Sequence, residues 1–124
     1  MTEVPLSELT YMEKPKTVES ILKRDFSEDF VQKMRNRIAT SHFKYGWAKE
    51  TFPDKGHALG TCMLEILSYY ETGNLEYLVD AANYCLLEFK NPSLPYAHFE
   101  ATDSHKSPGM VKRVIKPWEI PRKI

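Results

Sequence analysis

The sequence predicts an all-α protein, a small four-helix domain with a central antiparallel helical hairpin and extended N- and C-terminal arms. Two runs with apolar residues at three- and four-residue spacing flank Gly73 and Asn74, which suit the end of one helix and the cap of the next. Prolines interrupt any helical pattern toward both ends of the chain. We expect a single domain over residues 1–124, comprising an extended arm, a helical core and an extended basic tail at 1–16, 17–91 and 92–124.

Two helices are expected in the first half of the core. Thr17 can cap a short helix that runs to about Asp25. Ser27 precedes two acidic residues, so a cap and negative charge stand together at the start of a second helix. The apolar residues of that helix form one face as far as about His42, and Gly46 breaks the pattern.

The hairpin is expected in the second half of the core. Asp54 follows a proline and is the expected cap of a third helix that ends near Glu71. Its apolar stripe should enter the core, namely Leu59, Met63, Ile66, Leu67 and Tyr70. Asn74 caps a fourth helix that stops at Lys90, because a proline follows closely. Its expected buried face is Leu75, Val79, Ala82, Leu86 and Phe89.

The tail after Pro92 carries further prolines and several basic side chains. It is too broken by proline to form a helix and too apolar to stay free in water. We therefore expect it to lie extended against the helical body or a second subunit, with Trp118 as its main anchor.

The charge balance and the cysteines narrow the class of protein. Lys and Arg number 17, as do Asp and Glu, so no overall field draws the chain toward nucleic acid. Cys62 and Cys85 lie in apolar helical patterns without a C-x-x-C spacing, and we expect free, buried and unreactive thiols. No apolar run reaches the roughly 20 residues of a membrane span, and the first residues do not resemble a signal peptide. We expect a cytoplasmic protein that binds neither membrane nor nucleic acid.

Acidic side chains on the two hairpin helices are the best candidates for chemistry. Glu76, Asp80 and Asn83 fall one turn apart along one stripe, at the edge of the apolar face of the fourth helix. Antiparallel pairing could bring Glu65 of the third helix toward them. Clustered carboxylates bind Mg²⁺, because this cation prefers oxygen ligands and keeps waters for a substrate phosphate. The competing interpretation is a solvated helix edge with intrahelical hydrogen bonds.

The run from Asp54 to Phe89 resembles the MazG-type all-α nucleotide pyrophosphohydrolases, with its helix, its turn and the segment Leu75-Glu76-Tyr77-Leu78-Val79-Asp80. The resemblance implies paired helices that present acids to Mg²⁺ and cleave a nucleoside triphosphate to a monophosphate and pyrophosphate. Asp80 matches the aspartate of that family's E-x-x-D motif, and Asn83 lies where such enzymes place a polar group toward the nucleotide. The chain departs from the motif at position 77, which is Tyr rather than Glu.

Short proteins of actinomycetes, phages and other mobile elements resemble the chain in additional segments. The shared segments are Tyr45-Gly46, Thr72-Gly73-Asn74, Leu78-Val79-Asp80, Ala82-Asn83, Glu88-Phe89 and the run from His98 through Gly109. This resemblance supports the prediction of one domain and leaves the function open.

Two functions of different classes follow from these patterns. The first is nucleotide binding or metal-dependent nucleotide hydrolysis. For hydrolysis we assign Mg²⁺ to Glu65, Glu76 and Asp80, the ribose or base to Asn83, and the phosphate charge to Lys55 or Lys106. Lys106 lies in a Ser-, Asp-, Pro- and Gly-containing loop that either clasps a phosphate or is simply a turn.

The alternative is a non-enzymatic interaction protein of a phage or other mobile element, which binds a host or phage protein through its arms and tyrosines. For either function we expect a homodimer, because two long amphipathic helices and two short ones cannot easily enclose every apolar face.

Overall fold

A computed structural model describes residues 17–103 and 105–119, so the expected arm at 1–16 and the last residues of the tail lie outside the described part. Within those residues every regular element is helical, which confirms the all-α prediction. The elements are α1 (Val18–Asp25), α2 (Glu28–Tyr45), α3 (Ala48–Thr51), α4 (Ala58–Thr72), α5 (Glu76–Lys90) and a 3-10 turn (Pro117–Glu119).

The first two helices begin where the sequence predicts. The Thr17 hydroxyl accepts from the Ser20 N–H at 3.0 Å, and the Ser20 hydroxyl accepts from the Thr17 N–H, which completes a capping box at α1. The Ser27 hydroxyl accepts from the Phe30 N–H at 3.0 Å and caps α2. α2 continues past His42 to Tyr45, where Gly46 takes a positive φ of 81°. The helix is therefore longer than expected.

The connection between α2 and α4 differs from the sequence-based prediction. The short helix α3 lies between them, and α4 begins at Ala58 rather than after Asp54. The N–H groups of Lys55 and Gly56 both donate to the carbonyl of Thr51, so the chain around Asp54 closes a turn after α3 instead of starting a helix. The cap of α4 is a histidine, His57, whose Nδ1 accepts from the Gly60 N–H at 3.0 Å.

The hairpin between α4 and α5 is confirmed. Gly73 takes the left-handed conformation, with φ of 72°, and its N–H donates to the carbonyl of Tyr69 at 2.8 Å. The N-cap of α5 is Leu75 rather than the expected Asn74, and its side chain makes no capping hydrogen bond. Asn74 still satisfies one of the free amides of that helix end, because its Oδ1 accepts from the Glu76 N–H at 3.0 Å.

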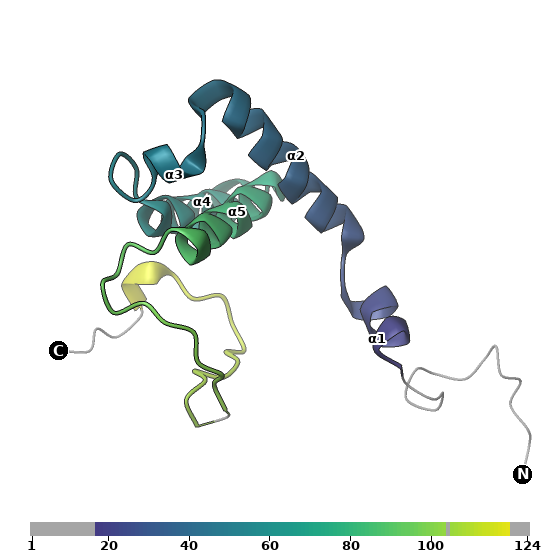
Figure 1. Cartoon of the computed structure of the whole chain (residues 1–124). Helices are drawn as coiled ribbons and strands as arrows, with labels where there is room; N and C mark the ends of the chain where they lie inside the picture. Colours follow the sequence, from purple (N-terminus) through teal and green to yellow (C-terminus); the bar gives the residue numbers. More distant parts are fainter. Residues whose placement is uncertain (1–16, 104, 120–124) are drawn as a thin grey trace, which may run out of the picture.

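The helices form a layered arrangement (Figure 1). α4 and α5 lie antiparallel and side by side, and α2 packs across α5. α2 and α3 lie on one side of the α4–α5 layer, and the described residues of the tail, 92–103 and 105–119, lie on the other side. α1 continues outward from the N-terminal end of α2, away from the layer. In the described residues, no helix combines the length and apolarity needed to cross a membrane.

The predicted core stripes of α4 and α5 were right only in part, since Val79 is buried as expected but several other predicted core residues are not. In the part of the chain that the structure describes, the buried apolar residues are Ala58, Cys62, Val79 and Ala81. Met63 and Ile66 of α4 are exposed, as are Leu75, Leu86 and Phe89 of α5. Small side chains explain the difference, since Cys62 lies close enough to α5 for its thiol to donate to the Ala81 carbonyl at 3.4 Å. The larger apolar residues are thereby turned away from the seam between the helices.

The tail contacts the hairpin through a different residue than expected. The ammonium of Lys116 lies 4.4 Å from the centre of the Tyr70 ring on α4, a cation–π contact. The rings of Phe99 and Phe89 meet edge to face. Trp118 is 76% exposed, so it does not anchor the tail within this chain.

Candidate functional site

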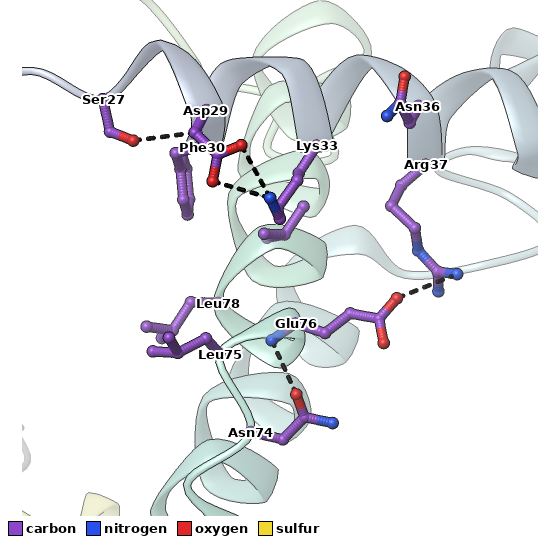
Figure 2. Close-up of a pocket in the computed structure, with 11 residues that line it drawn as sticks. Ser27, Asp29, Phe30, Lys33, Asn36, Arg37, Asn74, Leu75, Glu76 and Leu78 are labelled. Atoms are coloured by element: carbon purple, nitrogen blue, oxygen red, sulfur yellow. Dashed lines mark hydrogen bonds and ion pairs between the residues drawn. The ribbon is translucent and has the colours of Figure 1, made fainter.

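Arg37 of α2 is the centre of a cluster of charges that joins two helices. Its Nε donates to Oδ1 of Asp80 at 3.0 Å, and its Nη2 donates to Oδ2 at 3.2 Å. Nη1 lies 3.4 Å from Oε1 of Glu76, one turn earlier on α5 (Figure 2). The pKa of Arg37 is raised, first by its hydrogen bonds to Asp80. This bidentate pair fixes α2 against α5.

Glu65 of α4 lies beside this pair. Burial raises the pKa of its carboxyl, and the nearby Asp80 carboxylate raises it further, while Arg37 opposes both effects. One oxygen, Oε2, is buried and has no hydrogen-bond partner. A buried carboxylate oxygen normally accepts a hydrogen bond, so this atom marks a place where a ligand or water can donate one.

Asn83 carries a second buried acceptor of this kind. Its residue is 6% exposed, and its Nδ2 donates to the Met34 carbonyl of α2 at 3.0 Å. A carbonyl accepts only from the amide nitrogen, so this contact determines which way the side chain is turned. Its Oδ1 is therefore held in place, yet it is buried and has no partner.

Glu65, Asp80 and Asn83 line one groove, which we call the Tyr84 groove. It has a volume of about 840 Å³ and lies between the C-terminal half of α2, α3 and α5. Its walls carry the aromatic residues His42, Phe43, Tyr45, Trp47, Phe52 and Tyr84, and its basic residues are Arg37, Lys44, Lys49 and Lys90. Burial raises the pKa of Tyr84, with smaller contributions from Glu65 and Asp80. Shifted pKa values and convergent polar groups in a groove are typical of binding sites.

A second groove, the Phe30 groove, lies beyond Arg37 toward the start of α2. It measures about 670 Å³. Figure 2 shows Phe30, Leu75 and Leu78 along one part of it and polar side chains along the rest. Lys33 is paired with Asp29 on its own helix at 2.7 Å. The Phe30 groove therefore contains fewer unsatisfied polar groups than the Tyr84 groove.

The structure brings together part of the site expected from the sequence. Glu65, Asp80 and Asn83 share the Tyr84 groove, whereas Glu76 lines the Phe30 groove and joins the others through Arg37. The two expected phosphate ligands lie elsewhere. Lys55 lines neither groove, and Lys106 pairs with Glu100 of the tail at 3.0 Å.

Sequence reasoning missed the basic residues of the site. Arg37 reaches Asp80 across 43 positions of the chain, and no local spacing connects the two. Lys44, Lys49 and Lys90 come from three separate helices. Finding these basic residues requires knowing how α2 packs against α5 in space.

The acids as arranged do not fit Mg²⁺. Both oxygens of Asp80 already accept from Arg37, which also lies against Glu76. Among residues 17–103 and 105–119, no group of three or more His, Cys, Asp or Glu side chains is placed to hold a metal ion. A metal ion at Asp80 would require the guanidinium of Arg37 to move away.

Comparison with protein-family models, curated proteins and solved structures found no match to the chain. The site is therefore interpreted from its own residues.

Proposed function

We propose that the chain binds a nucleotide in the Tyr84 groove. The observation that carries this proposal is the pair of buried, unpartnered acceptor oxygens on two residues that line it, Oε2 of Glu65 and Oδ1 of Asn83. The free energy cost of burying such atoms is recovered when a ligand supplies donors. The groove volume of about 840 Å³ is in the range of small-molecule sites.

The base is the part of the ligand that suits the inner wall. Exocyclic amino groups and ring N–H groups of nucleobases donate hydrogen bonds, which Glu65 and Asn83 can accept. The rings of Phe52 and Tyr84 meet edge to face with centres 6.1 Å apart, and they provide an aromatic surface for a flat base.

The phosphates suit the basic residues of the same groove. Lys44, Lys49 and Lys90 are exposed residues on α2, α3 and α5. Ammonium groups bind phosphate oxygens as point charges, and several of them give affinity that falls with salt. In this proposal these lysines take the role that the sequence assigned to Lys55 and Lys106.

Magnesium and hydrolysis form a separate part of the proposal, which rests on the MazG-type resemblance. Asp80 and Glu76 become available to a cation only when Arg37 is displaced. An Arg37→Ala variant should then gain more thermal stability from millimolar Mg²⁺ than the unmodified chain does. Equal responses to Mg²⁺ would remove the metal from the proposal and leave nucleotide binding alone.

A thermal-shift series tests nucleotide binding. Nucleosides, monophosphates and triphosphates should raise the melting temperature in increasing order. Adenosine and cytidine should stabilise more than inosine and uridine, because their exocyclic amino group offers two N–H donors to the Glu65 and Asn83 acceptors, whereas inosine and uridine offer one ring N–H. No shift with any of them at millimolar concentration would contradict the proposal.

Exposed lysines supply the matched variants. Lys49→Gln should weaken the response to triphosphates and leave the response to nucleosides unchanged. Lys33→Gln, outside the Tyr84 groove, serves as the control, since it removes the same charge from the same protein. Equal losses for the two variants would indicate a general charge effect rather than a site.

A second candidate function, protein association, is favoured by the exposed apolar residues on the side of the α4–α5 layer opposite α2, which the tail covers only in part. On α4, the exposed residues Met63 and Ile66 lie roughly a third of a turn around the helix axis from the side that packs on α5. On α5, Leu86 and Phe89 are rotated by a similar angle, and in the same direction about the helix axis, from the side that packs on α4. Because the helices are antiparallel, both stripes lie on the side of the layer opposite α2. We name this apolar surface the open face.

The occupant we propose for the open face is a second copy of the chain. Two antiparallel helix pairs with one apolar face each form a four-helix bundle when they pack about a two-fold axis. Sedimentation should show a dimer at micromolar concentration, and Met63→Asp combined with Phe89→Asp should give monomers with unchanged helical content. A monomeric unmodified chain would leave the open face to a different protein.

A further inference from the structure

Two cysteines meet across the seam between α4 and α5. The Sγ atoms of Cys62 and Cys85 lie 3.5 Å apart, and both residues are free thiols. Cys62 is buried, whereas Cys85 is exposed, so the expectation of two buried thiols holds for one of them only. The pair therefore combines a sulfur that solvent can reach with a sulfur that it cannot.

The two thiols differ in reactivity as well as in exposure. Burial, followed by the hydrogen bond to Cys85, raises the pKa of Cys62 to about 11, so Cys62 stays protonated at neutral pH. Its other contact is the Ala81 carbonyl at 3.4 Å. Attack on an oxidant in solution is thus left to Cys85, with Cys62 held directly beside it.

We propose that Cys62 and Cys85 form a redox modification site that hydrogen peroxide converts to an intramolecular disulfide. The thiolate of Cys85 attacks the peroxide oxygen, the O–O bond breaks, and Cys85 becomes a sulfenic acid while hydroxide leaves and takes up a proton as water. The sulfur of Cys62 then attacks the Cys85 sulfur, the S–O bond breaks, and a second water leaves with the proton of Cys62. One peroxide is reduced to two waters, and two thiols are oxidised.

The geometry needs little adjustment for the bond to form. A disulfide brings its sulfurs to about 2.05 Å, so the pair must close by about 1.5 Å from its present separation. The product joins the middle of α4 to the middle of α5. Such a staple restricts the unfolded chain and should raise the melting temperature of the oxidised protein.

Oxidation of the full chain with hydrogen peroxide tests the proposal. Thiol titration should fall from two reactive groups per unfolded chain to none, and the intact mass should drop by two hydrogen atoms. Peptide mapping should find Cys62 and Cys85 in one linked peptide pair, and a reductant should restore both thiols. Because Cys85 borders the open face, the reaction is run at dilutions where sedimentation shows monomers.

Matched serine variants separate this site from general oxidation. Cys62→Ser should stop at an oxidised Cys85 that a sulfenic-acid reagent labels, and Cys85→Ser should resist peroxide at the concentrations that oxidise the unmodified chain. If Cys62→Ser unfolds, kinetics on the unmodified chain decide, since the internal disulfide forms at a rate independent of protein concentration. Disulfides between chains, or a sulfinic acid at Cys85 with Cys62 still free, would overturn the proposal.

Discussion

The two sides of the α4–α5 layer differ in a way opposite to the usual pattern. The side under α2 holds charged and polar contacts, including the Arg37–Asp80 pair and the Asn83 bond to the Met34 carbonyl. The opposite side presents large apolar residues, of which Phe89 is 73% exposed. Helices of a folded monomer normally bury their apolar stripe and expose their polar one.

This inversion is the physical basis of the two proposed functions. Polar groups that are enclosed without full satisfaction are costly, so a groove with two unpartnered acceptors is suited to a ligand. An apolar face that a monomer leaves open is suited to another protein surface. The two proposed functions thus fall on opposite sides of the layer, ligand recognition under α2 and association on the open face.

The largest effect is expected from removing the charge that holds the polar side together. Arg37→Met leaves Asp80 and Glu76 without their cation and should lower the free energy of unfolding by about 2 kcal/mol. A fully buried pair would lose roughly 3–5 kcal/mol, but the Arg37 side chain is 45% exposed and partly screened. Chemical denaturation followed by circular dichroism measures the change.

Lys33→Met is the control for the Arg37 variant. Lys33 pairs with Asp29 on its own helix, and both side chains are largely exposed, so its loss should cost less than about 0.5 kcal/mol. If both variants lost the same stability, the polar side would be an ordinary solvated surface rather than an enclosed interface.

The next effect compares one apolar residue from each side. Val79, 4% exposed, should lose about 1–2 kcal/mol on replacement by alanine, through lost burial and the cavity left behind. Phe89→Ala should cost less than about 0.5 kcal/mol at dilutions where the chain is monomeric, although it removes many more atoms.

Protein concentration sharpens this comparison. If a second copy covers the open face, the cost of Phe89→Ala should grow with concentration while the cost of Val79→Ala stays constant. A large cost for Phe89→Ala in the monomer would show that the tail covers the open face more fully than the Phe89–Phe99 contact indicates.

Sequence patterns predicted the elements of the fold better than their packing. Residues that cap or end a helix act on backbone groups only a few positions away. Thr17 and Ser27 could therefore be identified as helix starts, and Gly73 as a helix end, from the sequence alone. Which side of a helix is buried depends on its neighbours. The hydrophobic stripe of α4 pointed to Met63 as core, but the seam uses the small residues Ala58 and Cys62 instead.

The candidate site could be predicted in part for the same reason. One-turn spacing on α5 identified Asp80 and Asn83, and antiparallel pairing brought Glu65 to the same groove. Arg37 was not predicted, because its pairing with Asp80 depends on how α2 crosses α5. No local sequence pattern encodes that long-range arrangement. The same arrangement determines whether the acids are available to a cation.

The smallest effect concerns the pH dependence of the polar side. Burial, and then the Asp80 carboxylate, raises the folded pKa of Glu65 above its ordinary value of 4.5. Between those two pKa values the folded state holds more protons than the unfolded state, so stability from this group falls as pH rises through that window. Glu65→Gln removes the penalty and should raise the melting temperature at pH 7. The gain should shrink as the pH falls and the carboxyl of Glu65 takes up a proton in the folded protein.

Glu71→Gln, at an exposed position of the same helix, is the matched control and should change the melting temperature little at either pH. A Glu65→Gln variant that is less stable at pH 7 would mean that the attraction between Glu65 and Arg37 outweighs burial. The unpartnered oxygen would then be a stabilising part of the charge cluster rather than an acceptor waiting for a ligand, and the distinction between the two sides of the layer would lose its main functional argument.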